Sequence, residues 1–252
     1  MPDPNCPHCE GTGWHPVERG GVSAVERCSC NQARRPASLL IAAQIPPRFE
    51  QASFENFSIR RENPLASESL TKAMLDARHF VREYPLAAKP GVLFMGVPGA
   101  GKTHLAVAVL KGLLEKGFEG IFLDYTSMLE GILRSFDPAV GTGAREAYQA
   151  ALDTEVVLLD DLGARRASDW AIDTVFSIIN HRYNQKKATI VTTNLPDEAL
   201  GDKLAEKTEG SYRVKDSLSD RIGARARSRL FEMCRVVRFT VTEDYRMRGV
   251  RL

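Results

Sequence analysis

Two carboxylates follow directly on a short apolar run in the segment VVLLDDLG, residues 156–163. Adjacent Asp160 and Asp161 repel each other and lose hydration at the end of a buried strand, so a positive charge is expected beside them. A divalent cation would take Asp160 as a ligand, and Asp161 could polarise an attacking water as a general base. The pair predicts metal-assisted hydrolysis, unless both side chains are solvated in a loop.

A glycine-rich turn supplies the partner that such a pair requires. Residues 96–103, GVPGAGKT, match G-x-x-x-x-G-K-[ST] in full, between a predicted strand and a predicted helix. Glycines let backbone N–H groups surround a phosphate, and the helix N-terminus adds partial positive charge. Lys102 is expected to reach the β- and γ-phosphates of ATP, and Thr103 to ligate Mg²⁺ with Asp160. The predicted nucleotide-binding residues are Gly96, Val97, Pro98, Gly99, Ala100, Gly101, Lys102, Thr103 and His104.

Polar and cationic residues further along the chain complete the predicted site. The run TIVTT ends at Asn194, whose amide could hydrogen-bond the γ-phosphate or the water, although capping before Pro196 would also explain it. Arg225 and Arg229 are four residues apart and share one helix face. In ATPases that work as rings or filaments, an arginine stabilises the transition state in the neighbour, and we assign this role to Arg229, with Arg225 as the alternative. A solvated basic helix is the competing interpretation. Arg246 could fold back onto its own nucleotide.

Four of the five cysteines lie within the first thirty residues, as CPHC and CSC. The N-terminus has no apolar signal segment, so a reducing, cytoplasmic location is expected, where such a cluster indicates a metal site before a disulfide. Two close pairs can place four thiolates around one tetrahedral Zn²⁺, with His8 and His15 as substitutes. An iron–sulfur cluster or a disulfide-linked arm is the alternative. The expected zinc ligands are Cys6, Cys9, Cys28 and Cys30, whereas Cys234 lies in an apolar stretch and is expected in the core.

The elements that must position these residues follow from the hydrophobic pattern. From residue 91 onward, short apolar runs alternate with amphipathic helices, which predicts a parallel sheet with both faces covered. Strands are predicted at 91–95, 120–125, 156–160, 188–193 and 235–241, and helices at 68–84, 102–117, 126–136, 144–153 and 169–185. We divide the chain into a zinc-binding module at 1–35, a linker and helix at 36–88, and an ATPase domain at 89–252 without a sizeable lid domain.

The bulk composition argues against a protein that coats nucleic acid with its whole surface and against one that spans a membrane. Among 252 residues, 34 basic and 32 acidic side chains give a net charge of +2, so any nucleic-acid contact must come from local patches. The longest apolar runs are far shorter than the ~20 residues that span a bilayer. No membrane partner is expected.

Together the motifs resemble the DnaC/DnaI-type replicative helicase loaders of the AAA+ ATPases, close relatives of the initiator DnaA. The resemblance covers nearly all of the chain and depends on the order of IPPRFEQASFENF, GVPGAGKTHLA, LLDDLG, TTNLP and SRLFEMC followed by DYR. It implies a three-layer α/β P-loop fold with a parallel five-stranded sheet in the order 5-1-4-3-2. It also implies that Asn194 is sensor 1, Arg229 the arginine finger and Arg246 sensor 2.

The same resemblance implies partners. These are a DnaB-type hexameric helicase, contacted through the zinc module, single-stranded DNA, and a second copy of the chain reached by the trans arginine. The helices between residues 124 and 152 would line the DNA path. Their obvious cations are Arg134 and Arg145, so hydroxyls such as Ser127 or backbone amides would have to contribute. Phe54 and Phe57 fall where the family closes over the adenine base.

Two other functions compete with the loader. A transposition helper ATPase of the IstB type has nearly the same core and binds double-stranded DNA with a transposase, but such helpers generally lack the cysteine module. A catalytically idle, nucleotide-gated adaptor would keep the motifs without turnover.

Overall fold

The computed structural model describes residues 6–10, 14–19, 22–59, 63–134, 143–165, 168–197, 200–201, 205–208, 211–214 and 216–240. The strands are β1 (Trp14–Arg19), β2 (Val22–Arg27), β3 (Gly91–Gly96), β4 (Gly120–Asp124), β5 (Val156–Asp160), β6 (Ala188–Thr193), β7 (Ala205–Thr208), β8 (Ser211–Val214) and β9 (Cys234–Phe239). The α-helices are α1 (Ser29–Ala42), α2 (Pro64–Glu83), α3 (Lys102–Glu115), α4 (Tyr125–Arg134), α5 (Gly143–Asp153), α6 (Asp169–Asn184), α7 (Leu218–Ile222) and α8 (Ala224–Met233), and η1 (Pro47–Phe49) is a 3-10 turn.

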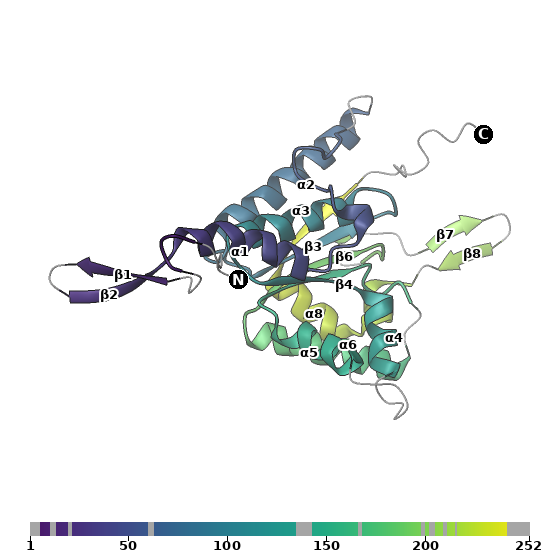
Figure 1. The fold of residues 1–252 in the computed structure, drawn as a ribbon. Helices are drawn as coiled ribbons and strands as arrows, with labels where there is room; N and C mark the ends of the chain where they lie inside the picture. Colours follow the sequence, from purple (N-terminus) through teal and green to yellow (C-terminus); the bar gives the residue numbers. More distant parts are fainter. Residues whose placement is uncertain are drawn as a thin grey trace.

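Five strands form one sheet in the order β4-β5-β6-β3-β9, and every neighbouring pair is parallel. Numbered by their order along the chain, these strands run 2-3-4-1-5, which is the predicted order 5-1-4-3-2 taken from the opposite edge. The predicted fold class is therefore confirmed. Strands β1 and β2, and likewise β7 and β8, form separate antiparallel hairpins (Figure 1).

Alternate side chains of each strand point to opposite faces of the sheet, and helices cover both faces. In β3, Val92 and Phe94 pack into one cluster with α2 and α3, whereas Leu93 and Met95 join a second cluster with α4, α6 and α8. Figure 1 shows α1, α2 and α3 on one side of the sheet and α4, α5, α6 and α8 on the other. Cys234 is fully buried in the second cluster, as the sequence predicted. None of the described helices is long and apolar enough to cross a bilayer.

Local capping explains where two of the long helices begin. The Asn63 side chain accepts a hydrogen bond from the Ala66 backbone N–H at 3.2 Å, and Pro64 occupies the first turn of α2. These features extend α2 four residues ahead of the predicted start at residue 68. Ser168 caps α6 by accepting from the Ala171 backbone N–H at 3.3 Å.

Helix α1 was not predicted, and it runs across the expected module boundary between residues 35 and 36. Leu39 packs against the first core cluster, and the carbonyl of Ala43 accepts a hydrogen bond from the Phe122 N–H of edge strand β4 at 2.8 Å. Cys28 is the residue immediately before this helix. The cysteine-rich segment is thus continued by a helix that is anchored on the ATPase core.

A buried arginine fixes the end of α5. Arg182 on α6 is fully buried, and its guanidinium donates hydrogen bonds to the carbonyls of Ala151, Thr154, Glu155 and Ala188 and to the Thr189 hydroxyl. Burial lowers the pKa of Arg182 to about 10, which still leaves it charged at neutral pH. Because the carbonyl end of a helix carries partial negative charge, this cation holds α5 to α6 without a carboxylate partner.

Candidate functional site

The turn between β3 and α3 has the backbone shape of a phosphate cradle. Gly99 and Gly101 have φ angles of 72° and 99°, in the left-handed region that favours glycine. A Cβ atom at Gly101 would also lie 2.8 Å from Cε2 of Phe57. Both the φ angle and this contact therefore disfavour a larger residue at position 101. A phosphate could approach the backbone of this turn closely, because neither glycine carries a side chain.

Lys102 opens α3 and is only 6% exposed. Its Nζ donates to the Val97 carbonyl at 2.7 Å and to Oδ1 of Asn194 at 2.6 Å. The ammonium group is therefore held inside the loop, at the carboxyl edge of the sheet. A triphosphate would be a stronger acceptor for it than either of these neutral oxygens.

Asp160 ends β5 and is 9% exposed. One carboxylate oxygen accepts from the Thr103 hydroxyl at 2.9 Å and from the Thr192 hydroxyl at 2.6 Å. Burial raises the pKa of Asp160, the two hydroxyls oppose that shift, and the neighbouring carboxylates Asp161 and Asp124 add to it. A buried carboxylate in contact with the phosphate-loop threonine is a donor set that suits Mg²⁺.

Asp161 has a φ angle of 57°, which turns its side chain out of the strand. Its N–H donates to the Thr192 hydroxyl at 2.8 Å, and its carboxylate accepts from Nδ2 of Asn194 at 2.5 Å. Asn194 therefore links Lys102 to Asp161. The turn after β6 is held by Thr193, whose hydroxyl accepts from the Leu195 N–H at 3.2 Å, so capping does not account for the Asn194 side chain.

A cavity of about 440 Å³ brings these groups together. Its lining combines the phosphate loop, both aspartates and the end of β6 with residues from 48 to 58 and one residue of α2. The lining residues are Arg48, Phe49, Asn56, Phe57, Ser58, Leu70, Gly99, Ala100, Gly101, Lys102, Thr103, His104, Asp160, Asp161, Thr192 and Asn194. The predicted residues Gly96, Val97 and Pro98 belong to the same turn but not to this lining.

The segment 48–58 was recognised only in part from the sequence. The Phe57 ring lies 5.5 Å from the His104 ring, and Nε2 of His104 lies 2.8 Å from the Ser53 carbonyl, so the segment packs on the first turn of α3. Phe54 instead lies beneath Arg78, with 5.2 Å between the guanidinium carbon and the ring centroid. The lining residues that were missed are Arg48, Phe49, Asn56, Ser58 and Leu70, although IPPRF marked the segment that begins this part of the chain.

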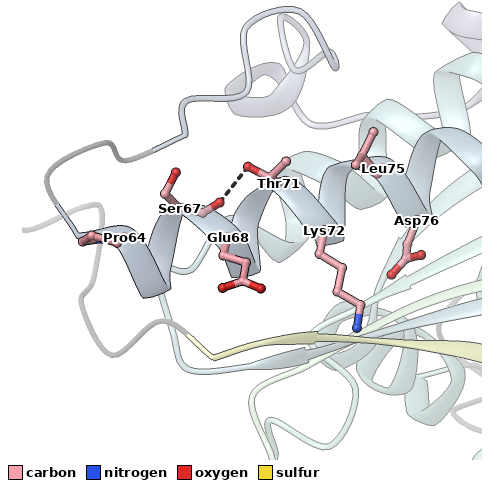
Figure 2. A pocket seen from close by; sticks show the side chains of 7 residues that line it. All are labelled: Pro64, Ser67, Glu68, Thr71, Lys72, Leu75 and Asp76. Atoms are coloured by element: carbon pink, nitrogen blue, oxygen red, sulfur yellow. Dashed lines mark hydrogen bonds between the residues drawn. The ribbon is translucent and has the colours of Figure 1, made fainter.

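A second hollow, of about 750 Å³, lies along α2 and has a different character. Figure 2 shows its side chains spread along one helix rather than converging from several elements. The Thr71 hydroxyl donates to the Ser67 carbonyl of the preceding turn at 2.7 Å. The lining is Pro64, Ser67, Glu68, Thr71, Lys72, Leu75 and Asp76, so this hollow has no glycine loop to cradle a phosphate.

The predicted arginines do not line the cavity of their own chain, as far as its described lining extends. Nε of Arg229 donates to Oδ1 of Asn180 on α6 at 2.8 Å, and the Arg225 guanidinium stacks on an α6 ring. Arg227 points elsewhere, as predicted, and forms a two-point ion pair with Asp197 at 2.5 and 2.6 Å. Arg246 lies outside the described residues.

The elements predicted to follow single-stranded DNA are α4 and α5, which pack against each other. Arg134 is exposed at the end of α4. Ser127 is also exposed, and its N–H donates to Asp124 at 2.7 Å. Arg145 belongs to α5, but its side chain lies outside what the structure describes.

Three of the four predicted zinc ligands meet in the structure. Cys6, Cys9 and Cys28 are buried, and their Sγ atoms all lie within 4.8 Å of one another. The Cys6 and Cys28 sulfurs are 3.6 Å apart, close to the roughly 3.8 Å edge that Zn–S bonds of 2.3 Å give in a tetrahedron. The three thiols fit one metal ion. Cys30 lies in the first turn of α1, and its side chain lies outside the described residues.

These features define a class of protein. A parallel sheet in the order 5-1-4-3-2, with a phosphate loop after one inner strand and an aspartate pair after another, is the core of a P-loop AAA+ ATPase. More narrowly, the chain belongs to the family described as IstB-like ATP binding protein, whose model matches residues 24–227. Membership implies binding of a nucleotide with Mg²⁺ and ATPase activity in general.

Two of the similar proteins are named as helicase loaders. The chain is similar to a crystal structure of the DnaC helicase loader, with 30% identity, a TM-score of 0.62, and coverage of 77% of this chain and 99% of that one. The replicative helicase loader DnaC of Escherichia coli strain K12 is 23% identical over 80% of this chain and 79% of its own length. Phage-like element PBSX protein XkdC of Bacillus subtilis strain 168 is 27% identical over the same shares. The chain is a DnaC-type AAA+ ATPase.

Proposed function

We propose that this chain is an ATP-dependent replicative helicase loader, which hydrolyses ATP while it places a hexameric helicase on single-stranded DNA. The observation that carries the proposal is the convergence of Lys102, Thr103, Asp160, Asp161 and Asn194 on one cavity. The 30% identity to a DnaC helicase loader over most of the chain supports this choice among the functions of AAA+ ATPases.

Each side chain of the cavity has a distinct task in hydrolysis. The glycine turn and the α3 N-terminus bind the phosphates, and Lys102 exchanges Asn194 for a phosphate oxygen. Thr103 and Asp160 would hold Mg²⁺, which neutralises charge on the β- and γ-phosphates. Asp161 accepts the proton of the attacking water. Asn194, released from Lys102, orients that water while it remains bonded to Asp161.

A transposition helper ATPase is the second candidate, because the matching family model is that of IstB-like proteins. The cysteine cluster favours the loader. Because the cluster is joined through α1 to the ATPase core, it could serve the proposed loader as a docking module in addition to the nucleotide site. Helpers of the IstB type work with a transposase and double-stranded DNA instead.

Capture experiments separate these two functions. The full chain, mixed with the replicative hexameric helicase of its own organism and a non-hydrolysable ATP analogue, is expected to co-elute with the helicase and to bind single-stranded DNA. The Lys102→Ala variant serves as the control that cannot respond to nucleotide. Co-elution with a transposase on double-stranded DNA, without helicase binding, would identify a transposition helper.

We also propose that Cys6, Cys9, Cys28 and Cys30 bind one zinc ion. The Sγ atoms of the three described cysteines lie within 4.8 Å of one another, which supports this proposal. Cys30 follows Cys28 by two residues in the sequence, and we propose it as the fourth ligand because a structural zinc site takes four. Zinc binding would stabilise a segment that has three buried cysteines as its own small cluster.

Thiol alkylation with and without a chelator tests the zinc site. In the zinc-loaded chain, the four N-terminal cysteines should resist iodoacetamide, and chelation should raise their alkylation rate at least about tenfold, because bound thiolates are shielded. Cys234 is the internal control: burial raises its pKa to about 12, so it should stay unmodified in both states. Mass spectrometry of peptides measures both rates. Equal rates with and without chelator, or zinc-free protein by elemental analysis, would contradict the site.

A further inference from the structure

Two arginines of α8 stack on a single aromatic ring of α6. The Arg225 guanidinium carbon lies 4.0 Å from the Phe176 ring centroid, and that of Arg229 lies 4.9 Å from it. Arg229 also lies 5.8 Å from the centroid of Tyr183. All three distances are within the ~6 Å range in which a cation is attracted to a ring face. One phenyl ring therefore positions two cations.

Hydrogen bonds fix the orientation of Arg229 on this ring. Its Nε donates to Oδ1 of Asn180, one turn after Phe176, and one terminal nitrogen donates to the backbone carbonyl of Arg225 at 3.2 Å. The Tyr183 hydroxyl donates to Glu232 at 2.7 Å, which holds the second ring in place. The platform formed by Phe176, Asn180 and Tyr183 thus restrains both guanidinium planes.

Arg225 and Arg229 differ from neighbouring arginines because no carboxylate among the described residues pairs with them. Arg221, Arg227 and Arg235 each contact a carboxylate, namely Asp216, Asp197 and Glu83. Within the described residues, neither Arg225 nor Arg229 has a carboxylate partner. Two like charges held side by side without a counterion repel each other, and an incoming polyanion would relieve that repulsion.

The cavity that the structure describes in the same chain does not place a phosphate site beside these arginines. The described lining of the 440 Å³ cavity has Lys102 and Arg48 as its cations, and it includes no residue of α6 or α8. The platform is also rigid, because α6 buries Val175, Ile178 and Ile179 against the core on its other side. A rigid pair of cations that has no carboxylate partner among the described residues is suited to a phosphate presented by another molecule.

We propose that Phe176 and Asn180 are positioning residues, which hold the Arg225–Arg229 pair ready for the triphosphate in the cavity of a second copy of this chain. The inference rests on the proposed ATPase function, together with the role in trans that the sequence analysis assigns to Arg229. It goes further by assigning the geometry of that arginine to α6. Phe176 and Asn180 do not touch the nucleotide themselves.

Variants at Phe176 and Asn180 test the platform by splitting binding from turnover. Phe176→Leu and Asn180→Ala should leave ATP affinity within about twofold of the unaltered chain, because the cavity of the variant chain is intact. Both should lower kcat at least about tenfold, since a small displacement of a charged group weakens transition-state stabilisation. Phe176→Tyr keeps the ring and should retain kcat within about threefold. Thermal unfolding shows which variants are folded. If Phe176→Leu does not fold, Asn180→Ala alone tests the proposal. Unchanged kcat in the folded variants would overturn the proposal.

Mixing subunits distinguishes a positioning role from a general defect. Phe176→Leu chains, or Asn180→Ala chains, mixed with Lys102→Ala chains should regain activity, because the second chain presents an intact platform to the working cavity of the first. Arg229→Ala mixed with Lys102→Ala is the reference. If the reference mixture is restored and the platform mixtures are not, the platform role is wrong. If the reference mixture also stays inactive, the assignment of Arg229 to a role in trans is what fails.

Discussion

Replacing Lys102 by alanine should lower the affinity for ATP at least about 100-fold and reduce hydrolysis below detection. A charge-assisted hydrogen bond in a shielded site contributes roughly 1.5–3 kcal/mol, and about 2.7 kcal/mol corresponds to a factor of 100. Lys102 is 6% exposed, and its ammonium is already held within the phosphate loop. The other described cation of the cavity, Arg48, belongs to η1 rather than to this loop, so it cannot replace the lost charge. Calorimetric titration with ATP measures the change.

A matched lysine on α2 provides the control. Lys72 is exposed and lines the second hollow, so Lys72→Ala removes the same charge without altering the phosphate loop. Its ATP affinity should remain within about twofold of the unaltered chain. If Lys72→Ala lost ATP binding while Lys102→Ala kept it, the nucleotide would lie along α2, and the assignment of the phosphate loop would be wrong.

The parts of the site that the sequence predicted are those specified by local pattern. Five apolar runs became the five strands of the sheet, and the residues that end β3, β5 and β6 converge because parallel strands end at one edge. The strand order came from the family resemblance and not from periodicity. The glycine turn was recognisable because its spacing encodes backbone geometry directly.

The parts that escaped prediction depend on contacts between residues far apart in the chain. Arg182 is an ordinary charged residue of an amphipathic helix until the fold surrounds it with backbone carbonyls. Arg48 enters the cavity only because the segment before α2 packs on α3, where the Lys111 ammonium also contacts the Glu50 carbonyl. Helix α1 was missed because Pro36 lies within it and the cysteines before it suggested a loop.

Asn194 shows how the fold adds chemistry to a recognised residue. The sequence indicated a polar group at the end of β6, and the structure places it between Lys102 and Asp161 at 2.6 and 2.5 Å. In the proposed mechanism, a γ-phosphate takes the ammonium of Lys102, and the amide oxygen of Asn194 becomes available to the attacking water. This mechanism would connect nucleotide binding to activation of the base through one side chain.

Asp161→Asn should therefore separate binding from hydrolysis. The amide cannot accept the proton of the water, so kcat should fall roughly 100- to 1000-fold, within the range that a general base contributes. Affinity for ATP should change by less than about threefold, because Lys102, Thr103 and Asp160 are unaltered. The backbone should also be preserved, since asparagine tolerates the φ angle of 57° at this position. Single-turnover hydrolysis, beside nucleotide titration, measures both quantities.

Asp161→Glu is the matched control, because it keeps the carboxylate and changes only its reach. Its kcat should stay well above that of Asp161→Asn, since a proton acceptor remains at the end of β5. A chain whose hydrolysis is unaffected by Asp161→Asn would have its base elsewhere. If the unaltered chain did not hydrolyse ATP even with single-stranded DNA and helicase present, the chain would instead be a nucleotide-gated adaptor. In such an adaptor, the link from Lys102 through Asn194 to Asp161 would respond to bound triphosphate without hydrolysing it.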